Sequence, residues 1–245
     1  MSKDRNRSLA AQDWVEVAAE PDHGEIFRNE QIRVYIAVIR PGRETLYHRH
    51  DKDTLYVVLQ GGRNYSTPMP GSAGGTYVFP KSISLARKIK WLFTRSIFGW
   101  TYLPKSVYLL MHNDGSPIIH KVRGSEANPS EMRMLGIEFL QPGGRNRSVS
   151  VGARPPPVDY EDDTVRVHRL KVPSDLKHLK GPVSFTGLVI ALKGALGIEA
   201  SSPGKADTVA HDLPEGDFLW NDGGMRFTFR TPGPSASEAL LVLMK

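Results

Sequence analysis

The twenty residues from Gly42 to Gly61, GRETLYHRHDKDTLYVVLQG, carry the strongest structural signal in this sequence. His48 and His50 stand one residue apart, and the apolar, β-branched run that follows at 55–59 predicts a buried strand. Because residues i and i+2 of a strand face the same side, both imidazoles are expected to project together. Such a pair can bind one metal ion, and two exposed histidines among charged neighbours are the alternative that spacing leaves open.

The same stretch resembles the first motif of the cupin superfamily. That motif reads Gly, five residues, His-x-His, three or four residues, Glu, six residues, Gly. Gly42, His48, His50 and Gly61 match it without a gap, whereas Thr54 stands where the motif has glutamate. The family's second motif has one further histidine on a later strand, and the run GSPIIHKVR supplies His120 there.

The resemblance implies an all-β chain of double-stranded β-helix barrels of the jelly-roll type. It also implies a metal held by His48, His50 and His120. Three neutral imidazoles with open coordination positions suit a divalent transition metal, namely Fe, Mn, Ni, Co or Zn. Without a carboxylate ligand the metal would keep its full 2+ charge and would favour an anionic or bidentate ligand.

Composition limits the chemistry further. The chain has 245 residues, with 40% hydrophobic and 24% charged residues, which is typical of a globular protein. Its 23 glycines and 18 prolines suit short strands joined by turns. There is no cysteine, so disulfides, thiolate nucleophiles and cysteine-bound zinc are excluded. A metal would therefore depend on histidine and oxygen donors.

Charge and hydropathy give weaker expectations about partners and location. The net charge of +6 favours a small anionic ligand but specifies little alone, and no nucleic-acid partner is expected. The first residues contain no apolar run, and no window reaches the roughly 18 apolar residues of a membrane-spanning helix. We therefore expect a cytoplasmic protein, and the resemblance to cupins implies a homodimer.

The first half is expected to contain an N-terminal arm at 1–23 and a cupin barrel at 24–150. Within that barrel, apolar residues at helical spacing predict a basic amphipathic helix over 84–99. Ser84 and Gly99 would cap its ends. This helix would pack on the barrel with its lysines in water, close over the pocket as a lid, or lie on a membrane surface.

The second half is expected to repeat the first after a proline-rich linker at 151–157. Arg33-Val34 recurs as Arg166-Val167, and Leu59 to Gly61 recurs as Leu192 to Gly194, both 133 residues later. A second barrel is therefore expected over 158–245. This second barrel lacks the candidate metal ligands. The positions of His48, His50, Thr54 and His120 are held by Gly181, Val183, Gly187 and Phe227.

Barrel geometry predicts which other residues line the first site. If the two motif histidines point inward, alternation also turns Thr54, Tyr56 and Val58 inward. Asp53 and His112 are fallback ligands, although each is better explained as part of a surface turn. The other histidines have no partner at ligand spacing, namely His23, His168, His178 and His211.

Two functions from different classes remain. The first is a metal-dependent oxygenase-type enzyme acting on a small anionic or phenolic substrate, because three-histidine cupin sites resemble those of thiol dioxygenases and gentisate-type ring-cleaving dioxygenases. The second is a non-catalytic cupin that binds a small ligand or acts as an interaction module. Two features favour this alternative: the motif's glutamate is missing from the first barrel, and the second barrel has none of the motif's ligand residues.

Overall fold

The computed structural model describes residues 13–72, 76–78, 100–111, 117–141, 156–162, 164–174, 183–202 and 208–245. These residues form eighteen β-strands in three sheets and one short 3-10 helix, which confirms the all-β fold class. The helix expected over 84–99, the linker residues 151–155 and His112 lie outside the described residues. Within the described part of the chain, no helix has the length and apolar character that spanning a bilayer requires.

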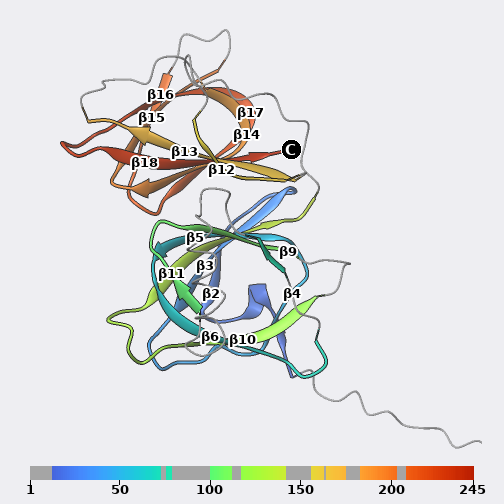
Figure 1. Cartoon of the computed structure of the whole chain (residues 1–245). Coiled ribbons are helices and arrows are strands. Elements are labelled where there is room, and N and C mark those ends of the chain that lie inside the picture. The colour runs from blue at the N-terminus through green and yellow to red at the C-terminus, as the bar shows by residue number, and fades with distance from the viewer. Residues whose placement is uncertain are drawn as a thin grey trace, which may run out of the picture.

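The first half folds into two sheets that face each other, forming the lower barrel in Figure 1. One sheet has the order β1-β4-β10-β6-β8, with the bounds β1 (Val15–Glu16), β4 (His48–His50), β6 (Gly62–Pro68), β8 (Trp100–Tyr102) and β10 (Ile118–Gly124). The other has the order β2-β3-β11-β5-β9-β7, with the bounds β2 (His23–Arg28), β3 (Ile32–Ile39), β5 (Thr54–Gln60), β7 (Thr76–Val78), β9 (Val107–Met111) and β11 (Met132–Phe139). The 3-10 helix η1 (Val17–Ala19) joins β1 to β2.

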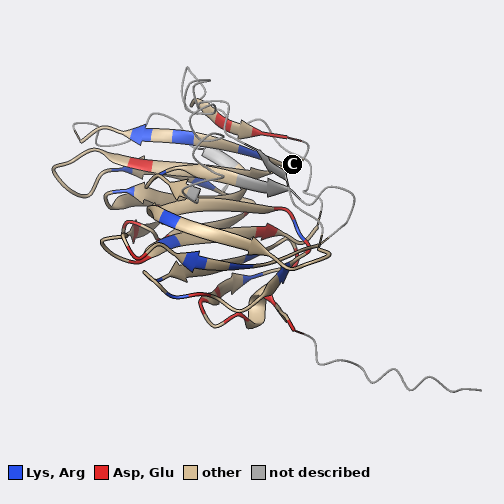
Figure 2. Cartoon of the chain, turned by 60° about the horizontal axis from the view of Figure 1, so that its bottom comes forward, with Lys and Arg blue, Asp and Glu red and all other residues tan. Residues whose placement is uncertain are grey.

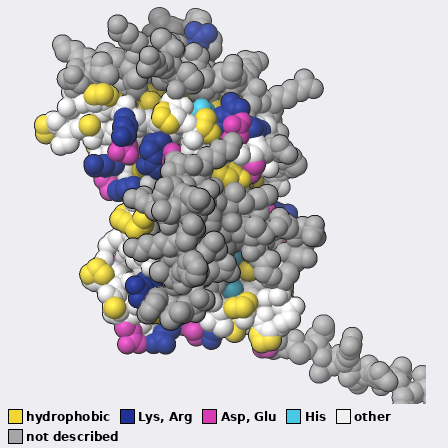
Figure 3. Space-filling model, viewed as in Figure 1, with side chains coloured by type: hydrophobic (Ala, Val, Ile, Leu, Met, Phe, Trp, Pro, Cys, Tyr) yellow, Lys and Arg dark blue, Asp and Glu magenta, His cyan; other side chains and the backbone are white. Residues whose placement is uncertain are grey.

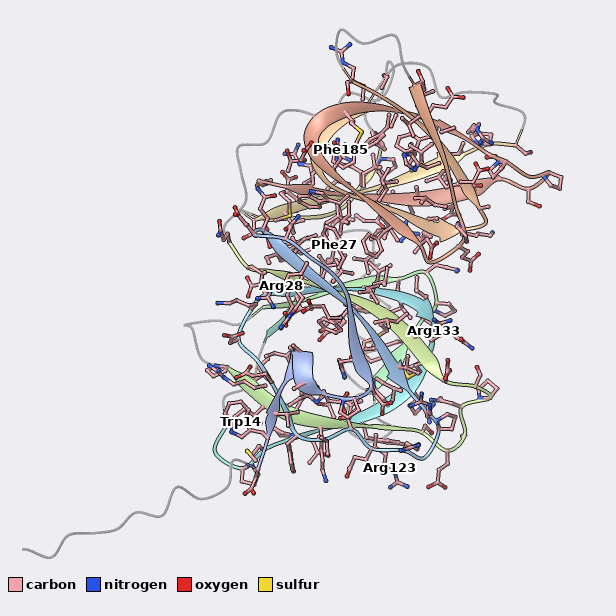
Figure 4. All side chains as sticks on the ribbon, turned by 180° about the vertical axis from the view of Figure 1, so that it is seen from behind. Trp14, Phe27, Arg28, Arg123, Arg133 and Phe185 are labelled. Carbon is pink, nitrogen blue, oxygen red and sulfur yellow. The ribbon has the colours of Figure 1, made fainter. Side chains whose placement is uncertain are left out.

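The second half forms one seven-stranded sheet that curls into the upper barrel of Figure 1. Its order is β12-β13-β18-β14-β17-β15-β16, with the bounds β12 (Val158–Glu161), β13 (Val165–Val172), β14 (Val183–Lys193), β15 (Leu196–Ser201), β16 (Thr208–Leu213), β17 (Phe218–Arg230) and β18 (Ser237–Met244). Phe185, labelled in Figure 4, packs in its interior with Phe227 and Phe229.

Strand alternation divides the side chains of the first barrel between two hydrophobic cores. On β5, Tyr56 and Val58 face the barrel interior, whereas Leu55 and Val57 belong to a different cluster on the outer face. On β11, a Cβ at Gly136 would lie 2.2 Å from the ring of Tyr35, so glycine makes room for that ring inside the barrel. Strands that are apolar on both faces are therefore buried on both faces.

The outer cluster joins the two barrels. It combines buried residues of β3, β5 and β11 with buried residues of β13, β14 and β18, including Ile137, Leu135, Val167, Leu188 and Val242. Phe27 lies at the junction, as Figure 4 shows, with its ring centroid 5.9 Å from that of Phe218. Arg169 of the second barrel also donates a 3.0 Å hydrogen bond to the carbonyl of Lys105 in the first. The two halves thus share a continuous core.

Charged side chains are distributed over the outside of this arrangement. Lysine and arginine are interleaved with aspartate and glutamate along the described strands in Figure 2. Many of them form ion pairs, such as Arg49 with Glu16 and Lys121 with Glu44. The described part of the face in Figure 3 likewise mixes hydrophobic, basic and acidic side chains. Such exposed pairs add little to stability.

The strand register confirms the internal repeat. β3 and β13 each have eight residues, and both their first and last residues are 133 positions apart. Arg33 and Arg166 are the second residues of these strands, and each strand pairs antiparallel with the last strand of its own half. The internal repeat, which was predicted from short matches in the sequence, is therefore confirmed for these individual residues.

The described part of the expected N-terminal arm contributes to the first barrel. Val15 pairs in parallel with His48, and β2 begins at His23. Val17 of η1 is buried in the barrel's inner core. Contacts with the first barrel thus include residues before 24. The polar sequence of this segment did not indicate the strand pairing of Val15 or the burial of Val17.

Candidate metal centre

The three motif histidines meet inside the first barrel. His48 and His50 are fully buried on β4, and Arg49 between them turns outward to pair with Glu16. His120 lies on the neighbouring strand β10, directly opposite His48 in the register. One ring nitrogen from each histidine lies within 4.8 Å of the others, which is compatible with a single metal ion.

Hydrogen bonds at the Nδ1 atoms of His48 and His120 orient these two rings. His48 Nδ1 lies 2.9 Å from the carbonyl oxygen of Leu46, so Nδ1 carries the proton and donates it. His120 Nδ1 lies 2.7 Å from the hydroxyl of Ser66. His48 Nε2 is buried with no hydrogen-bond partner among the described residues. A buried nitrogen lone pair of this kind fits a metal ligand.

Burial also keeps His48 neutral. Desolvation, reinforced by the nearby His23, lowers the pKa of His48 to about 4. At neutral pH the imidazole is therefore neutral, with its proton on Nδ1, and a metal can bind Nε2 without displacing a proton.

A fourth histidine stands beside the cluster. His23 of β2 is buried, and its ring centroid lies 4.6 Å from that of His48. Its Nδ1 is 2.6 Å from Glu20 Oε2, in a buried pair. Burial opposes ionisation of Glu20, but hydrogen bonds from His23 and from the amides of Asp22 and Leu46 outweigh it and hold the pKa of Glu20 below its ordinary value.

Sequence reasoning assigned no role to His23, because 25 positions separate it from His48. A local signal could not have found the pair, since β2 joins the site through its pairing with β3 in the opposite sheet. Glu20 escaped notice for the same reason. Its carboxylate also accepts a 3.3 Å hydrogen bond from the amide of Leu46, whose carbonyl holds His48.

A buried carboxylate approaches the cluster from the other side. Glu138 of β11 is fully buried and forms an ion pair with Arg33 of β3. Its Oε1 lies 4.0 Å from His50 Nδ1. Burial raises the pKa of Glu138, against the opposing attraction of Arg33.

The predicted lining residues have different environments. Tyr56 lines the cavity beside the histidines and receives a 2.9 Å hydrogen bond from the hydroxyl of Tyr35. Thr54 is buried, and its hydroxyl donates to the carbonyl of Lys52 at 3.0 Å. Val58 packs in the inner core. Of the fallback ligands, Asp53 does not join the histidine cluster among the described residues.

The cavity itself is small. Its volume is about 30 Å³, which gives room for on the order of two water-sized groups. Asn64 is a polar residue of the lining that sequence reasoning missed, and its buried Oδ1 has no hydrogen-bond partner among the described residues. The lining consists of His23, Ile39, His48, His50, Tyr56, Asn64, Ser66, Tyr102, His120, Val122 and Met134.

The second barrel has an apolar interior in the corresponding region. Val183 and Gly187 take the places of His50 and Thr54 at the offset of 133 residues, and Phe227 is fully buried in the aromatic core. Within the described residues, the three-histidine cluster occurs in the first barrel alone.

Comparison with known proteins extends the fold assignment. No protein-family model matches the sequence, and no curated protein matches it. Among solved structures, AerE from Microcystis aeruginosa matches with a TM-score of 0.50 and 10% identity, covering 92% of this chain and 98% of AerE. A cupin 2 conserved barrel domain protein from Leptotrichia buccalis has a TM-score of 0.46 and 9% identity, over 91% of this chain and 88% of its own. The vicilin from Solanum melongena has a TM-score of 0.48 and 12% identity, over 92% and 82%.

At these identities the similarity concerns the fold and carries no activity with it. The facing sheets of the first half, the register of the repeat and the full-length structural match agree with one another. The chain therefore consists of two β-barrels in tandem, and its fold is similar to that of AerE over nearly the whole length of both chains.

Proposed function

We propose that this protein is a metal-dependent enzyme of the oxygenase type that acts on a small anionic or phenolic substrate. The observation that carries the proposal is the convergence of His48, His50 and His120 on one cavity, with their ring nitrogens within 4.8 Å of one another. The neutral state of His48 and its unpartnered Nε2 fit a divalent transition metal as the missing partner.

The donor set indicates which ions fit. Imidazole nitrogens suit Fe, Mn, Ni, Co and Zn, and the three rings would hold the ion while leaving coordination positions open. A bound metal would supply Lewis acidity and, if it were iron or manganese, redox chemistry with dioxygen. The carbonyl of Leu46 and the hydroxyl of Ser66 would keep two of the rings oriented.

The cavity narrows the substrate class. Among the described residues that line it there is no lysine or arginine, and the metal would balance the charge of an anionic substrate. Asn64 Oδ1 would accept a hydrogen bond from a donor group on the substrate, such as a hydroxyl, amine or thiol. A volume of about 30 Å³ falls well below the roughly 150 Å³ of a cavity that binds benzene. Small aliphatic anions with a neighbouring donor therefore fit better than phenols.

Metal analysis of the purified protein, followed by oxygen uptake, tests the proposal. The protein is loaded with Fe(II) and, separately, with Mn(II), Ni(II), Co(II) and Zn(II), and is then mixed with small thiol acids, hydroxy acids and dihydroxy-aromatics. The proposal expects one metal equivalent per chain and oxygen uptake with at least one substrate. The variant His50→Ala should abolish uptake, and His211→Ala in the second barrel should retain it.

A non-catalytic ligand-binding cupin is the second candidate. The observation that favours it is Thr54 at the position of the motif's glutamate, together with an apolar second barrel. This candidate predicts that the metal-loaded protein binds small anions, which a shift in melting temperature would report, but consumes no oxygen with any of the substrates.

A further inference from the structure

The first barrel contains a buried ion pair that the cupin motif does not include. Glu138 is fully buried, the Arg33 side chain is 11% exposed, and the Nε and Nη2 groups of Arg33 both donate to Glu138 Oε2. Desolvation makes such a pair costly, and apolar residues of similar volume are often as stable or more stable. Stability alone therefore does not explain why these two charges stand inside the barrel.

The second carboxylate oxygen points to a role. Oε1 of Glu138 is buried and has no hydrogen-bond partner among the described residues. It lies 4.0 Å from Nδ1 of His50, which is also fully buried. This separation is longer than a hydrogen bond. The carboxylate thus stands behind the ring that would bind the metal.

The strand register relates this carboxylate to the missing motif residue. Glu138 on β11 lies directly opposite Thr54 on β5, which occupies the motif's glutamate position. In the second barrel the residues equivalent to Arg33 and Thr54 are Arg166 and Gly187, and both pair with Leu243. The second barrel, whose described residues form no three-histidine cluster, therefore has leucine at the position of Glu138.

We propose that Glu138 is a positioning residue of the metal centre: it directs His50 Nδ1–H toward its own carboxylate and Nε2 toward the metal, and Arg33 holds Glu138 in place. The inference rests on the proposed metal centre. Leu46 and Ser66 serve His48 and His120 in the same way. Metal-binding histidines generally donate their other N–H to such an outer partner, which fixes the ring and raises its basicity.

This arrangement also explains the relocation of the carboxylate. A glutamate at position 54 would bind the metal directly and reduce its charge. A carboxylate at 138 strengthens the His50 ligand, while the guanidinium of Arg33 balances its negative charge. The metal would keep its full 2+ charge for an anionic substrate, and a coordination position would remain open.

Titration with Co(II) tests the inference without measuring turnover, because the visible absorption of Co(II) reports its coordination geometry. Three variants are compared with the wild type. Glu138→Gln keeps an acceptor oxygen but removes the charge. The double variant Arg33→Met/Glu138→Leu removes both charges and leaves no unpaired ion, so its fold should be retained. Glu161→Gln breaks the ion pair of Arg166, the repeat equivalent of Arg33, away from the site.

The expected result is a loss of Co(II) affinity of about 10-fold to 100-fold in Glu138→Gln and in the double variant, with a changed visible spectrum. Glu161→Gln should match the wild type. Wild-type affinity and spectrum in the folded double variant would overturn the inference and leave the metal centre standing. A wild-type protein that binds no Co(II) would overturn both.

Discussion

At the scale of single residues, the candidate site is organised by what stands behind each imidazole. His48 donates to a backbone carbonyl, His120 contacts a hydroxyl, and His50 faces a carboxylate at 4.0 Å. These partners differ in chemistry but each lies on the Nδ1 side of its ring. The Nε2 side is therefore the common direction of the cluster, as expected of a site built for one ion.

Loss of a histidine should lower metal binding. His48→Ala, His50→Ala and His120→Ala each remove one of three ligands, so bound Zn(II) per chain should fall well below that of the wild type. His211→Ala is the control, since that residue lies on β16 of the second barrel. Metal content measured by mass spectrometry after dialysis checks this. Equal content in all four variants would show that the cluster does not hold the metal.

Asn64 should show a trade-off between stability and binding. Leucine in its place removes a buried acceptor that has no hydrogen bond among the described residues. Asn64→Leu should therefore raise the free energy of unfolding by about 1 kcal/mol, because an unsatisfied buried polar group costs about 1–3 kcal/mol. The substitution should also weaken substrate binding, because the acceptor oxygen of Asn64 is lost. Urea unfolding and the KM for oxygen uptake report the two effects, and Asn64→Asp serves as the polar control. A less stable leucine variant would contradict this.

At the scale of elements, the segment from β1 to the start of β2 closes one end of the histidine cluster. Glu20 links the parts of this segment, because its carboxylate accepts from His23, Asp22 and Leu46. The same Leu46 holds His48 through its carbonyl. A single carboxylate thus connects the N-terminal segment to the loop that carries the first ligand.

The contribution of Glu20 should depend on pH. Its pKa is lower in the folded protein than its ordinary value of 4.5, so the stabilisation is present above pH 4.5 and is lost as the pH falls through the folded pKa. The unfolding free energy of the wild type should therefore exceed that of Glu20→Gln at pH 7, with a smaller difference at pH 3. Urea unfolding at both pH values measures this. A difference that stays constant would mean that the pKa of Glu20 is the same in the folded and unfolded states.

The pairing of β5 with β11 predicts the behaviour of a restored motif residue. Thr54→Glu places a second carboxylate directly opposite Glu138, and like charges at opposed positions destabilise a sheet. The metal-free variant should melt below the wild type. In the Glu138→Gln background, Thr54→Glu should lower the melting temperature by less. It should also raise the affinity for Zn(II) above that of Glu138→Gln alone. Thr54→Gln controls for size. Equal melting of both glutamate variants would show that the two side chains do not meet.

At the scale of the whole molecule, the second barrel completes a core that the first cannot bury alone. The outer faces of β3, β5 and β11 are apolar and pack against β13, β14 and β18. Ile32, Val34, Leu55 and Ile137 have no exposure because of this contact. The second barrel therefore stabilises the sheet that carries Glu138.

This shared core predicts one cooperative unfolding transition. Ile137→Ala should lower the free energy of unfolding by about 2–5 kcal/mol, since the cavity would open where both barrels pack. Near-UV circular dichroism and limited proteolysis should show both halves unfolding together. Val209→Ala, at an exposed position, should change stability by about 0.5 kcal/mol or less. Two separate transitions in Ile137→Ala would indicate that the barrels fold independently.

Much of this arrangement was predictable from sequence. The spacing of His48 and His50 placed both rings on one face, and the matches 133 residues apart predicted the strand equivalence that the register confirms. The run Ile32 to Ile39 is apolar on both faces, and the strand that it forms has buried residues on both sides. These features are local, because alternation is a property of the strand backbone itself.

The surroundings of the histidines were not predictable in this way. Glu20, His23, Asn64 and Glu138 carry no motif, and the apolar or polar character of their neighbours does not distinguish them. They reach the cluster through strand pairings across two sheets, and a shift of one residue in any register would turn them to the opposite face. The sequence by itself determined that the first barrel holds the three motif histidines and that His48 and His50 lie on the same face of their strand. Only the tertiary structure decided which carboxylates stand behind them, because register is set by the packing of the whole barrel and not by any one strand.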